Sequence, residues 1–438
     1  MNKNEKRLIR THFSSEVKPD IAGSRIHLLG WVHEIRDLGG IKFILLRDKS
    51  GICQVTVKKK DVKKEVLEKV EKIRLEYVVS IEGIVSINDK VKGGAEVLLE
   101  DINIISEAKQ PLPYDIVGKV KANLDTRLNY RVLDLRKLEN RAIFIIGNVI
   151  LNEVRNFLIK EGFIEIRTPR IISTATEGGA ALFTINYFNK IAFLAQSPQL
   201  YKEELITVFE KVYEIGPFFR AEESHTTRHI SEFTSIDIEA AFHTKEDVME
   251  LLERMIKEII DKVSQKCKEE LKILNINLEP IKLPILRITY DEAISKIQEA
   301  NIKIDWGEDF SIEHLRYLGK IYPTWYFIID FPTISKPFYI QPNPLNEKIC
   351  ESFDLMYKWI EIASGGQRIS NKDLLISRLK EQKLNPESFK YHLEIYDYGM
   401  PPHSGWAVGF ERLLMVLTGK KNIREVCLFP RDKFRLIP

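Results

Sequence analysis

The sequence predicts an α+β protein made of a small all-β domain followed by a larger mixed domain. Three observations support this prediction. The chain has 438 residues, more than one hydrophobic core usually organises. Residues 26–105 form short segments rich in β-branched and aromatic residues, whereas residues beyond 130 alternate long amphipathic helical patterns with strands.

The first domain is predicted at residues 1–107. Gly39-Gly40, Gly51, Asn88-Asp89 and Gly93-Gly94 separate five strand-like segments, namely HLLGWVHEI, IKFILLRD, GICQVTV, YVVSIEGIVS and AEVLLEDINII. Between the third and fourth segments, apolar residues recur at helical spacing, at Val62, Val66, Val70 and Ile73. Five strands with a helix after the third is the order of an OB-fold barrel, a fold that often binds single-stranded nucleic acid.

Residues 108–130 contain two prolines close together and are predicted to be a hinge, and residues 131–438 form the second domain. Residues 140–160 follow a helical pattern, and GFIEIRTPRI then leads through a turn into a strand that ends near Pro169. Residues 246–274 form another long helical stretch. YEIGPFFRAE, EFTSIDIEAAF and YFIIDFP are strand-like, which makes this domain a mixture of helices and strands.

Composition excludes several classes of protein. The formal net charge of +3 is too small to indicate a nucleic-acid partner by itself. The four cysteines lie far apart without a CxxC pair, which argues against a zinc site or a disulfide framework. The first residues are charged, and no run of eighteen apolar residues occurs, so we expect a cytoplasmic protein that does not bind a membrane.

A charged hairpin is the first candidate for chemistry. The apolar strand that ends in Phe219-Arg220 opens into AEESHTTRH, and a second apolar strand, EFTSIDIEA, returns. Arginine makes planar, bidentate contacts with phosphate oxygens, so an arginine beside a basic tip suits a bound polyphosphate. The alternative is a salt-bridged surface hairpin, which is a common feature of proteins.

The second candidate is SGWAVGFERLLM, residues 404–415, which reads as a strand, a glycine turn and a helix. Gly409 would let a ligand approach the backbone, and Arg412 in the first helical turn can stack on a flat ring. The alternative is simply close packing of a strand against a helix.

In this order, the strand with Pro169, the FRAE hairpin and the final GFERL turn resemble the three motifs of class II aminoacyl-tRNA synthetases. The resemblance covers nearly the whole chain and is greatest to aspartyl-tRNA synthetases of the archaeal and eukaryotic type. It rests on QSPQLYKE, FRAEE with TTRH, SGGQRI and GMPPHSGWAVGFERLLM. It implies an anticodon-binding OB-fold barrel and a catalytic domain built on an antiparallel sheet flanked by helices.

The resemblance also implies an ATP site. Arg220 and Arg412 are its implied catalytic residues, with Arg220 on the α-phosphate and the reacting carboxylate, and Arg412 stacked over the adenine from above. The implied contacts are adenine with Glu222 and Phe233, and the γ-phosphate side with Arg228 and His229. The full implied set is Arg220, Ala221, Glu222, Arg228, His229, Ile230, Phe233, Glu361, Gly409, Phe410, Glu411 and Arg412.

By the same resemblance, Asp354, Glu361 and Ser364 would hold Mg²⁺ against the phosphates of ATP. Hard oxygen ligands suit magnesium, which bridges phosphates and keeps several waters. Without the resemblance, two acids seven residues apart would be interpreted as ordinary surface charges. The substrate carboxylate itself attacks phosphorus, so the protein needs to supply positioning and positive charge rather than a nucleophile.

For the amino acid, the resemblance implies that Arg368 and Lys202 receive a side-chain carboxylate, which favours aspartate over neutral asparagine. Glu177 and Asp237 would lie near the ammonium group, and His403 would come from a mobile loop near the substrate carboxylate. The alternative for each residue is a buried structural role. The full implied set is Glu177, Gln199, Leu200, Tyr201, Lys202, Arg220, Asp237, Ser364, Arg368 and His403.

In the barrel, Phe43 and Gln54 match positions that stack on and hydrogen-bond anticodon bases, and Arg36 matches a phosphate or base contact. The alternative for Phe43 is a barrel-core residue. His33 stands where some archaeal-type relatives carry a tryptophan that discriminates the third anticodon base. The smaller histidine predicts an enzyme that charges both tRNA-Asp and tRNA-Asn.

Two other functions remain open from the sequence. The same fold could belong to an asparaginyl-tRNA synthetase, and ATP–pyrophosphate exchange with each amino acid separates the two. A paralogue that does not charge tRNA, such as an amidoligase or a regulatory RNA binder, is disfavoured because Arg220, Arg412 and the barrel are all present. The resemblance further predicts a homodimer formed through the motif that carries Pro169.

Overall fold

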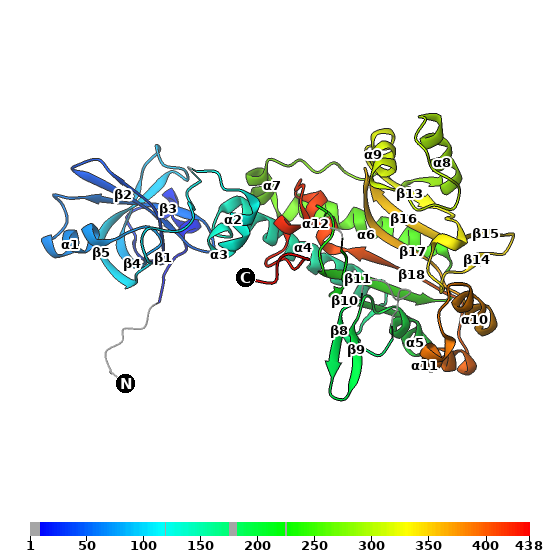
Figure 1. Ribbon diagram of the computed structural model, residues 1–438. Coiled ribbons are helices and arrows are strands. Elements are labelled where there is room, and N and C mark those ends of the chain that lie inside the picture. The colour runs from blue at the N-terminus through cyan, green and yellow to red at the C-terminus, as the bar shows by residue number, and fades with distance from the viewer. Residues whose placement is uncertain (1–8, 119, 175–181, 224–225) are drawn as a thin grey trace. The chain divides into compact units, whose positions relative to one another are not determined.

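The computed structural model of the protein describes residues 9–118, 120–174, 182–223 and 226–438 (Figure 1). It divides into two compact units, Met1–Leu138 and Glu139–Pro438. Each unit has its own hydrophobic core, as the α+β prediction of two domains requires.

The first unit contains a closed five-stranded barrel in the order β1-β2-β3-β5-β4, with a helix after the third strand. This confirms the predicted OB-fold. Its elements are β1 (Arg25–Asp37), β2 (Ile41–Arg47), β3 (Ile52–Lys58), α1 (Lys64–Lys72), β4 (Val78–Ile87) and β5 (Ala95–Ser106), preceded by the short 3₁₀ helices η1 (Ser14–Glu16) and η2 (Pro19–Ile21).

The buried carboxylate of Asp134 holds together the segment that follows the barrel. It contains α2 (Leu124–Asn129) and α3 (Arg131–Asp134). Asp134 is fully buried, accepts a hydrogen bond from the Tyr114 hydroxyl at 2.8 Å and pairs with Arg131 at 2.8 Å. A buried charge is tolerated when it is paired and hydrogen-bonded. These contacts belong to the first unit, which therefore ends at Leu138, beyond the predicted hinge at 108–130.

The second unit is built on an eight-stranded sheet that is antiparallel except for its two edge pairs, β12–β13 and β10–β6. This agrees with the predicted antiparallel sheet. In sheet order the strands are β12 (Leu286–Thr289), β13 (Trp325–Ile329), β16 (Ser352–Tyr357), β17 (Ile360–Gln367), β18 (His403–Gly409), β11 (Glu232–Ala241), β10 (Lys211–Phe219) and β6 (Ile164–Glu165).

Two small sheets accompany it. One consists of β7 (Ile171–Ile172), β9 (Lys190–Leu194) and β8 (Thr184–Tyr187), whose β8–β9 hairpin projects from the unit in Figure 1. The other is the hairpin of β14 (Pro342–Asn343) and β15 (Asn346–Cys350).

Helices flank the main sheet (Figure 1). They are α4 (Leu138–Lys160), α5 (Gln199–Phe209), α6 (Lys245–Lys266), α7 (Lys268–Leu274), α8 (Tyr290–Glu299), α9 (Ile312–Ile321), α10 (Lys372–Glu381), α11 (Lys390–Ile395) and α12 (Phe410–Leu417). The 3₁₀ helices are η3 (Thr333–Ser335), η4 (Pro386–Phe389), η5 (Tyr396–Tyr398) and η6 (Ile423–Val426). The helical stretch predicted at 246–274 is two helices that meet at Cys267.

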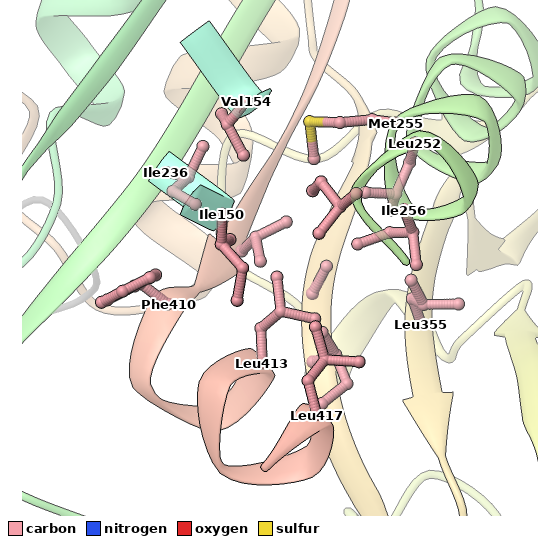
Figure 2. Packing of buried hydrophobic residues seen from close by; sticks show 14 of the residues in the cluster. Ile150, Val154, Ile236, Leu252, Met255, Ile256, Leu355, Phe410, Leu413 and Leu417 are labelled. Atoms are coloured by element: carbon pink, nitrogen blue, oxygen red, sulfur yellow. The ribbon is translucent and has the colours of Figure 1, made fainter. Parts of the chain in front are cut away.

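The main core lies between α4, α6 and α12 and the sheet. Helix α6 begins after Thr244, whose hydroxyl accepts a hydrogen bond from the backbone N–H of Asp247, an N-cap that satisfies an orphan donor. Apolar residues then recur at helical spacing and face inward. Figure 2 shows how these side chains converge with those of the sheet: Ile150, Val154, Ile236, Leu252, Met255, Ile256, Leu355, Phe410, Leu413 and Leu417.

Helix α4 is, by length and composition, apolar enough to cross a membrane. Half of the corresponding window is buried inside the protein, however, and Ile143, Ile146, Ile150 and Val154 are fully buried in the main core. Helix α4 therefore packs as a core helix of this unit.

Candidate active site and nucleic-acid surface

A pocket opens on the central strands, between the β10–β11 hairpin, β17, β18 and the start of α12. Ten of the twelve residues predicted for ATP line it; Ala221 does not, and Phe410 is packed in the main core. The lining residues are Arg220, Glu222, Arg228, His229, Ile230, Phe233, Ser235, Glu361, Ile362, Ser364, Ala407, Gly409, Glu411, Arg412 and Ile423. Two distant sequence motifs thus meet at one site.

Strand register explains how the residues gather. Asp354 of β16 pairs with Ser364 of β17, Ser364 pairs with Ala407 of β18, and Ala407 pairs with Asp237 of β11. Directly paired residues on neighbouring strands point to the same face of a sheet. The row therefore joins the predicted metal ligands Asp354 and Ser364 to Asp237, which was predicted to bind the amino acid.

The pocket carries several positive charges around Glu361. Burial opposes ionisation of Glu361, yet the charges of Arg412, Lys336, Arg220 and Arg228 hold the pKa of its carboxyl below the ordinary value. Arg412 lies 3.4 Å from the Glu361 carboxylate and donates to the Glu361 carbonyl at 3.1 Å. Burial, and then Arg412, lower the pKa of Arg228. Like charges held this close indicate a site for an anion.

An aromatic ring lies beside charged groups in the same pocket. The guanidinium of Arg220 lies 5.2 Å from the ring centroid of Phe233. Glu222 lies 3.7 Å from His229, whose pKa burial lowers, so the imidazole is neutral near pH 7. A ring, a carboxylate and a guanidinium together fit a planar heterocycle with exocyclic donors.

Glu411 lines the pocket, but its hydrogen bonds have a mainly structural role. Both of its carboxylate oxygens accept the backbone N–H of Thr234, at 3.1 and 2.9 Å, and the side chain is buried. Burial raises the pKa of this carboxyl to about 7. Glu411 therefore holds the start of α12 against β11, which positions the neighbouring Arg412.

The three predicted magnesium ligands lie together. The hydroxyl of Ser364 hydrogen-bonds Asp354, and Asp354 and Glu361 are close enough to interact electrostatically. Both oxygens of Asp354 also accept from the Lys336 ammonium, at 2.9 and 2.8 Å. Among the described residues no group of three or more His, Cys, Asp or Glu side chains could hold a metal ion. Two carboxylates and a hydroxyl nevertheless suit magnesium, which draws its remaining ligands from phosphates and water.

Beyond Asp237 lies a buried ionic cluster that joins α5 to the sheet. Lys202 of α5 lies 3.2 Å from Asp237 and 3.4 Å from Glu239. Arg368, directly after β17, pairs with Glu239 at 3.1 Å. Gln199 donates to Glu239 at 3.3 Å. The predicted cations Lys202 and Arg368 therefore share the partner Glu239, and Lys202 also pairs with Asp237.

Local sequence makes this cluster possible. Gly405 of β18 pairs with Glu239, and a Cβ atom at Gly405 would lie 2.5 Å from the Glu239 carboxylate. Only glycine leaves room for the acid that holds Arg368. Of the remaining residues predicted for the amino acid, Leu200 is buried and Tyr201 half-buried on α5, whereas Glu177 lies outside the described residues.

His403 differs from its predicted position in a mobile loop. It is the first residue of β18, fully buried, and its carbonyl accepts the Arg368 backbone N–H at 2.9 Å. Its Nδ1 donates to the Pro401 carbonyl at 2.8 Å, and its Nε2 lies 3.7 Å from Glu203. The two prolines before it suggest a loop, but the strand begins directly after them.

Sequence reasoning missed several residues of this site, namely Glu203, Glu239, Lys336 and Trp359. Glu239 is two residues beyond Asp237 on the same strand, so strand alternation could have placed it on the same face. Trp359 lies between the predicted ligands Asp354 and Glu361. Lys336 precedes Asp354 in an irregular segment and carries no sequence signal.

The barrel brings the four predicted anticodon residues onto its first three strands. Phe43 is half-buried and alternates with the buried Ile44 and Lys42, and it pairs with Arg36 on β1. The core alternative for Phe43 is therefore wrong, because its ring faces away from the barrel interior. Gln54 is also half-buried and donates to Glu96 at 2.8 Å.

His33 occupies an irregular point of β1. The register shifts between Val32 and Glu34, so His33 is an extra residue in a β-bulge. Its Nδ1 lies 3.2 Å from Arg47, which forms a bidentate pair with Glu76 at 2.8 and 2.7 Å. The contact with Arg47 thus fixes the imidazole of His33, which is half-exposed.

An OB-fold barrel followed by an antiparallel sheet with an arginine-rich pocket defines the class II tRNA synthetase architecture. The chain belongs to this family: the family described as tRNA synthetases class II (D, K and N) matches residues 123–433. The OB-fold nucleic acid binding domain matches residues 26–105.

Relatives match over nearly the full length. The Aspartate--tRNA(Asp/Asn) ligase of Archaeoglobus fulgidus is 50% identical over 97% of this chain and 99% of its own. The Aspartate--tRNA(Asp) ligase of Pyrococcus abyssi is 49% identical over 98% and 100%. Among solved structures, the asparaginyl-tRNA synthetase of Pyrococcus horikoshii with asparaginyl-adenylate has a TM-score of 0.94, with 33% identity over 98% of this chain and 99% of that one.

Proposed function

We propose that the protein joins L-aspartate to tRNA at the expense of ATP. In the first step an aspartate carboxylate oxygen bonds to the α-phosphorus, the bond to the bridging oxygen breaks, and pyrophosphate leaves. In the second step the terminal ribose hydroxyl of tRNA attacks the aspartyl carbonyl carbon, and AMP leaves. Relatives named as aspartate–tRNA ligases support this proposal, as does the site itself.

The observation that carries the choice of aspartate is the cluster around Asp237. Asp237 Oδ1 faces Lys202, while its buried Oδ2 has no hydrogen-bond partner among the described residues. A buried acceptor without a donor is costly, so a ligand donor is expected there. The ammonium group of an amino acid supplies one, and Lys202 and Arg368 then lie beside its side chain.

The charge balance favours an acidic side chain. Lys202 and Arg368 carry two positive charges; both pair with Glu239, and Lys202 also pairs with Asp237. When the substrate ammonium takes over part of the negative charge of Asp237, Lys202 gains capacity for the substrate side-chain carboxylate, and Lys202 and Arg368 then have Glu239 as their common partner. A neutral asparagine amide does not supply that charge, so its binding leaves the cations poorly compensated.

Arg220 is proposed to hold the α-phosphate and the reacting carboxylate together. Its planar guanidinium can contact two oxygens at once, and the developing negative charge on phosphorus strengthens that contact in the transition state. Arg228 is proposed to neutralise the outer phosphates, and Arg412 to stack over the adenine. The protein supplies position and charge, and it transfers no proton in the first step.

For magnesium, Asp354, Glu361 and Ser364 are the proposed ligands. A bound magnesium ion would neutralise phosphate charge and hold the triphosphate in one conformation. In the structure Lys336 neutralises Asp354. The family also implies a homodimer and a cytoplasmic location; half-exposed apolar residues beside Pro169, Ile164 and Ile171, are suitable for a subunit contact.

For tRNA, the outer face of β1–β3 is proposed to bind the anticodon, with Phe43 stacking on a base and Arg36 contacting phosphate. His33 is proposed to admit the anticodons of both tRNA-Asp and tRNA-Asn. The relatives carry both kinds of name, so the comparison leaves either range possible. The half-exposed position of the imidazole supports contact with a base.

Amino-acid-dependent ATP–pyrophosphate exchange tests the first step. We expect exchange with aspartate and none with asparagine; exchange with asparagine alone would instead support the asparaginyl function of the structural neighbour. No exchange with either amino acid would favour a paralogue without charging activity.

Aminoacylation of tRNA-Asp and tRNA-Asn transcripts with labelled aspartate tests the tRNA range. We expect both transcripts to be charged. Efficient charging of tRNA-Asp alone would contradict the relaxed range while leaving the proposed ligase activity intact.

A further inference from the structure

Trp359 lies between two arginines from separate elements. It occupies the turn that joins β16 to β17, two residues before Glu361 of the pocket lining. The guanidinium carbon of Arg228 lies 5.0 Å from the ring centroid of Trp359, and that of Arg316 lies 5.3 Å from the same centroid. Both distances are within the range of a cation–π contact. Arg228 also donates to the Trp359 carbonyl at 3.4 Å.

Helix α9 is fixed at this place by a close backbone approach. A Cβ atom at Gly319 would lie 2.7 Å from the Lys358 carbonyl carbon and 2.7 Å from the Trp359 nitrogen. Arg316 precedes Gly319 by one helical turn, so the two residues share a face of the helix. Glycine thus lets α9 rest on the β16–β17 turn, and Arg316 is brought to the Trp359 ring as a consequence.

Arg316 lies at the surface without a carboxylate partner among the described residues. Arg228 and Arg412 are close enough to each other to repel, and Arg316 adds to the same repulsion on Arg228. Four guanidinium groups (Arg220, Arg228, Arg316 and Arg412) and two carboxylates (Glu222 and Glu361) therefore act on one another in and beside the pocket, while Lys336 and Asp354 neutralise each other. This surplus of positive charge suits a multiply charged anion.

We propose that Arg316 binds the outer phosphates of ATP and the departing pyrophosphate, and that Trp359 is a positioning residue that holds Arg228 and Arg316 in place for this contact. The inference rests on the proposed function and identifies a contribution from α9, which lies outside the three sequence motifs. Trp359 lowers the entropy lost on binding by restricting two flexible side chains before the ligand arrives. Exposure of Arg316 suits a group that must release pyrophosphate into solvent.

ATP–pyrophosphate exchange at saturating aspartate, without tRNA, tests this proposal. Arg316→Gln is expected to raise the KM for ATP and for pyrophosphate about tenfold each, as loss of one charge-assisted phosphate contact predicts. The KM for aspartate and the kcat are expected to change less than about twofold. Arg316→Lys should restore part of the affinity, because the charge returns without the planar stack.

Two further variants separate positioning from folding. Trp359→Phe keeps an aromatic face and should stay near the wild-type KM for ATP, whereas Trp359→Leu should raise it as Arg316→Gln does. Lys296→Gln is the charge control, because Lys296 on the neighbouring helix α8 is already paired with Glu299 at 2.9 Å. Lys296→Gln should leave the kcat and the KM values for ATP, pyrophosphate and aspartate unchanged.

The outcomes that would overturn the proposal are distinct. If the unchanged chain catalyses exchange and Arg316→Gln has the wild-type KM for ATP, the role proposed for Arg316 is refuted. The proposed function then still stands. Loss of tRNA charging in Arg316→Gln with normal exchange would assign Arg316 to the acceptor end of tRNA instead. Absence of aspartate-dependent exchange in the unchanged chain would overturn both proposals.

Discussion

His392 of α11 carries a charge that connects two helices beneath the amino-acid site. Its imidazole is buried, with Nε2 3.4 Å from Glu203 and Nδ1 3.3 Å from Glu204, both on α5. Burial opposes its protonation, but the carboxylates of Glu203 and Glu204 raise the pKa of His392 to about 9 from the ordinary 6.5. His403 and the Tyr396 hydroxyl also face Glu203, at 3.7 and 3.3 Å.

The size of the effect follows from linkage. Each pKa unit corresponds to about 1.4 kcal/mol, so the raised pKa contributes about 3 kcal/mol to the free energy of unfolding. Because the folded pKa is the higher one, this stability is fully present below pH 6.5 and is lost as the pH rises through about 9. His392→Asn should therefore lose about 3 kcal/mol at pH 6 and much less at pH 10.

Denaturant unfolding of both proteins at several pH values, followed by tryptophan fluorescence, measures this difference. Tyr396→Phe is the matched control: it removes the hydroxyl that contacts Glu203 at 3.3 Å but no group that titrates between pH 6 and pH 9. Tyr396→Phe should lower the free energy of unfolding by the same amount at every pH. If His392→Asn lowers the free energy of unfolding as much at pH 10 as at pH 6, the proposed pairing of protonated His392 with Glu203 and Glu204 is refuted.

Three other substitutions test the proposed roles. Arg220→Ala should reduce aspartate-dependent ATP–pyrophosphate exchange by about 10²–10³-fold or more, because it removes charge from the transition state; exchange within tenfold of wild type would contradict this. Phe43→Ala should raise the KM for tRNA about tenfold through loss of one stacked base while exchange stays normal; equal loss of both activities would contradict the barrel assignment. His33→Trp should reduce charging of tRNA-Asn more than that of tRNA-Asp, and a matched reduction of both would show that the bulge does not select the anticodon.

The sequence predicted the architecture because its signals are local and periodic. Alternation along IKFILL assigned β2, and the structure shows Ile44 and Leu46 buried inside the barrel with Phe43 outside. The pocket was also predictable, because Arg220 and Arg412 lie in contiguous motifs whose strands, β10–β11 and β18, are paired through β11. Motifs of this kind contain the chemistry within a few residues.

Residues that act through long-range contacts could not be predicted in this way. Lys336 neutralises Asp354 from an irregular segment, and Arg316 reaches the site only because Gly319 lets α9 pack on the β16–β17 turn. The prediction of a mobile loop for His403 came from the family resemblance and could not include the pairing of β18 with β11 and β17. Tertiary contacts decide these positions.

The cluster of Lys202, Arg368 and Asp237 is central to the proposed choice of substrate. A crystal structure with a non-hydrolysable aspartyl-adenylate analogue tests it most directly. Lys202 and Arg368 should contact the side-chain carboxylate of the analogue, and Asp237 Oδ2 should accept its ammonium group. A bound analogue whose side-chain carboxylate points away from both cations, with Asp237 still lacking a donor, would contradict the account.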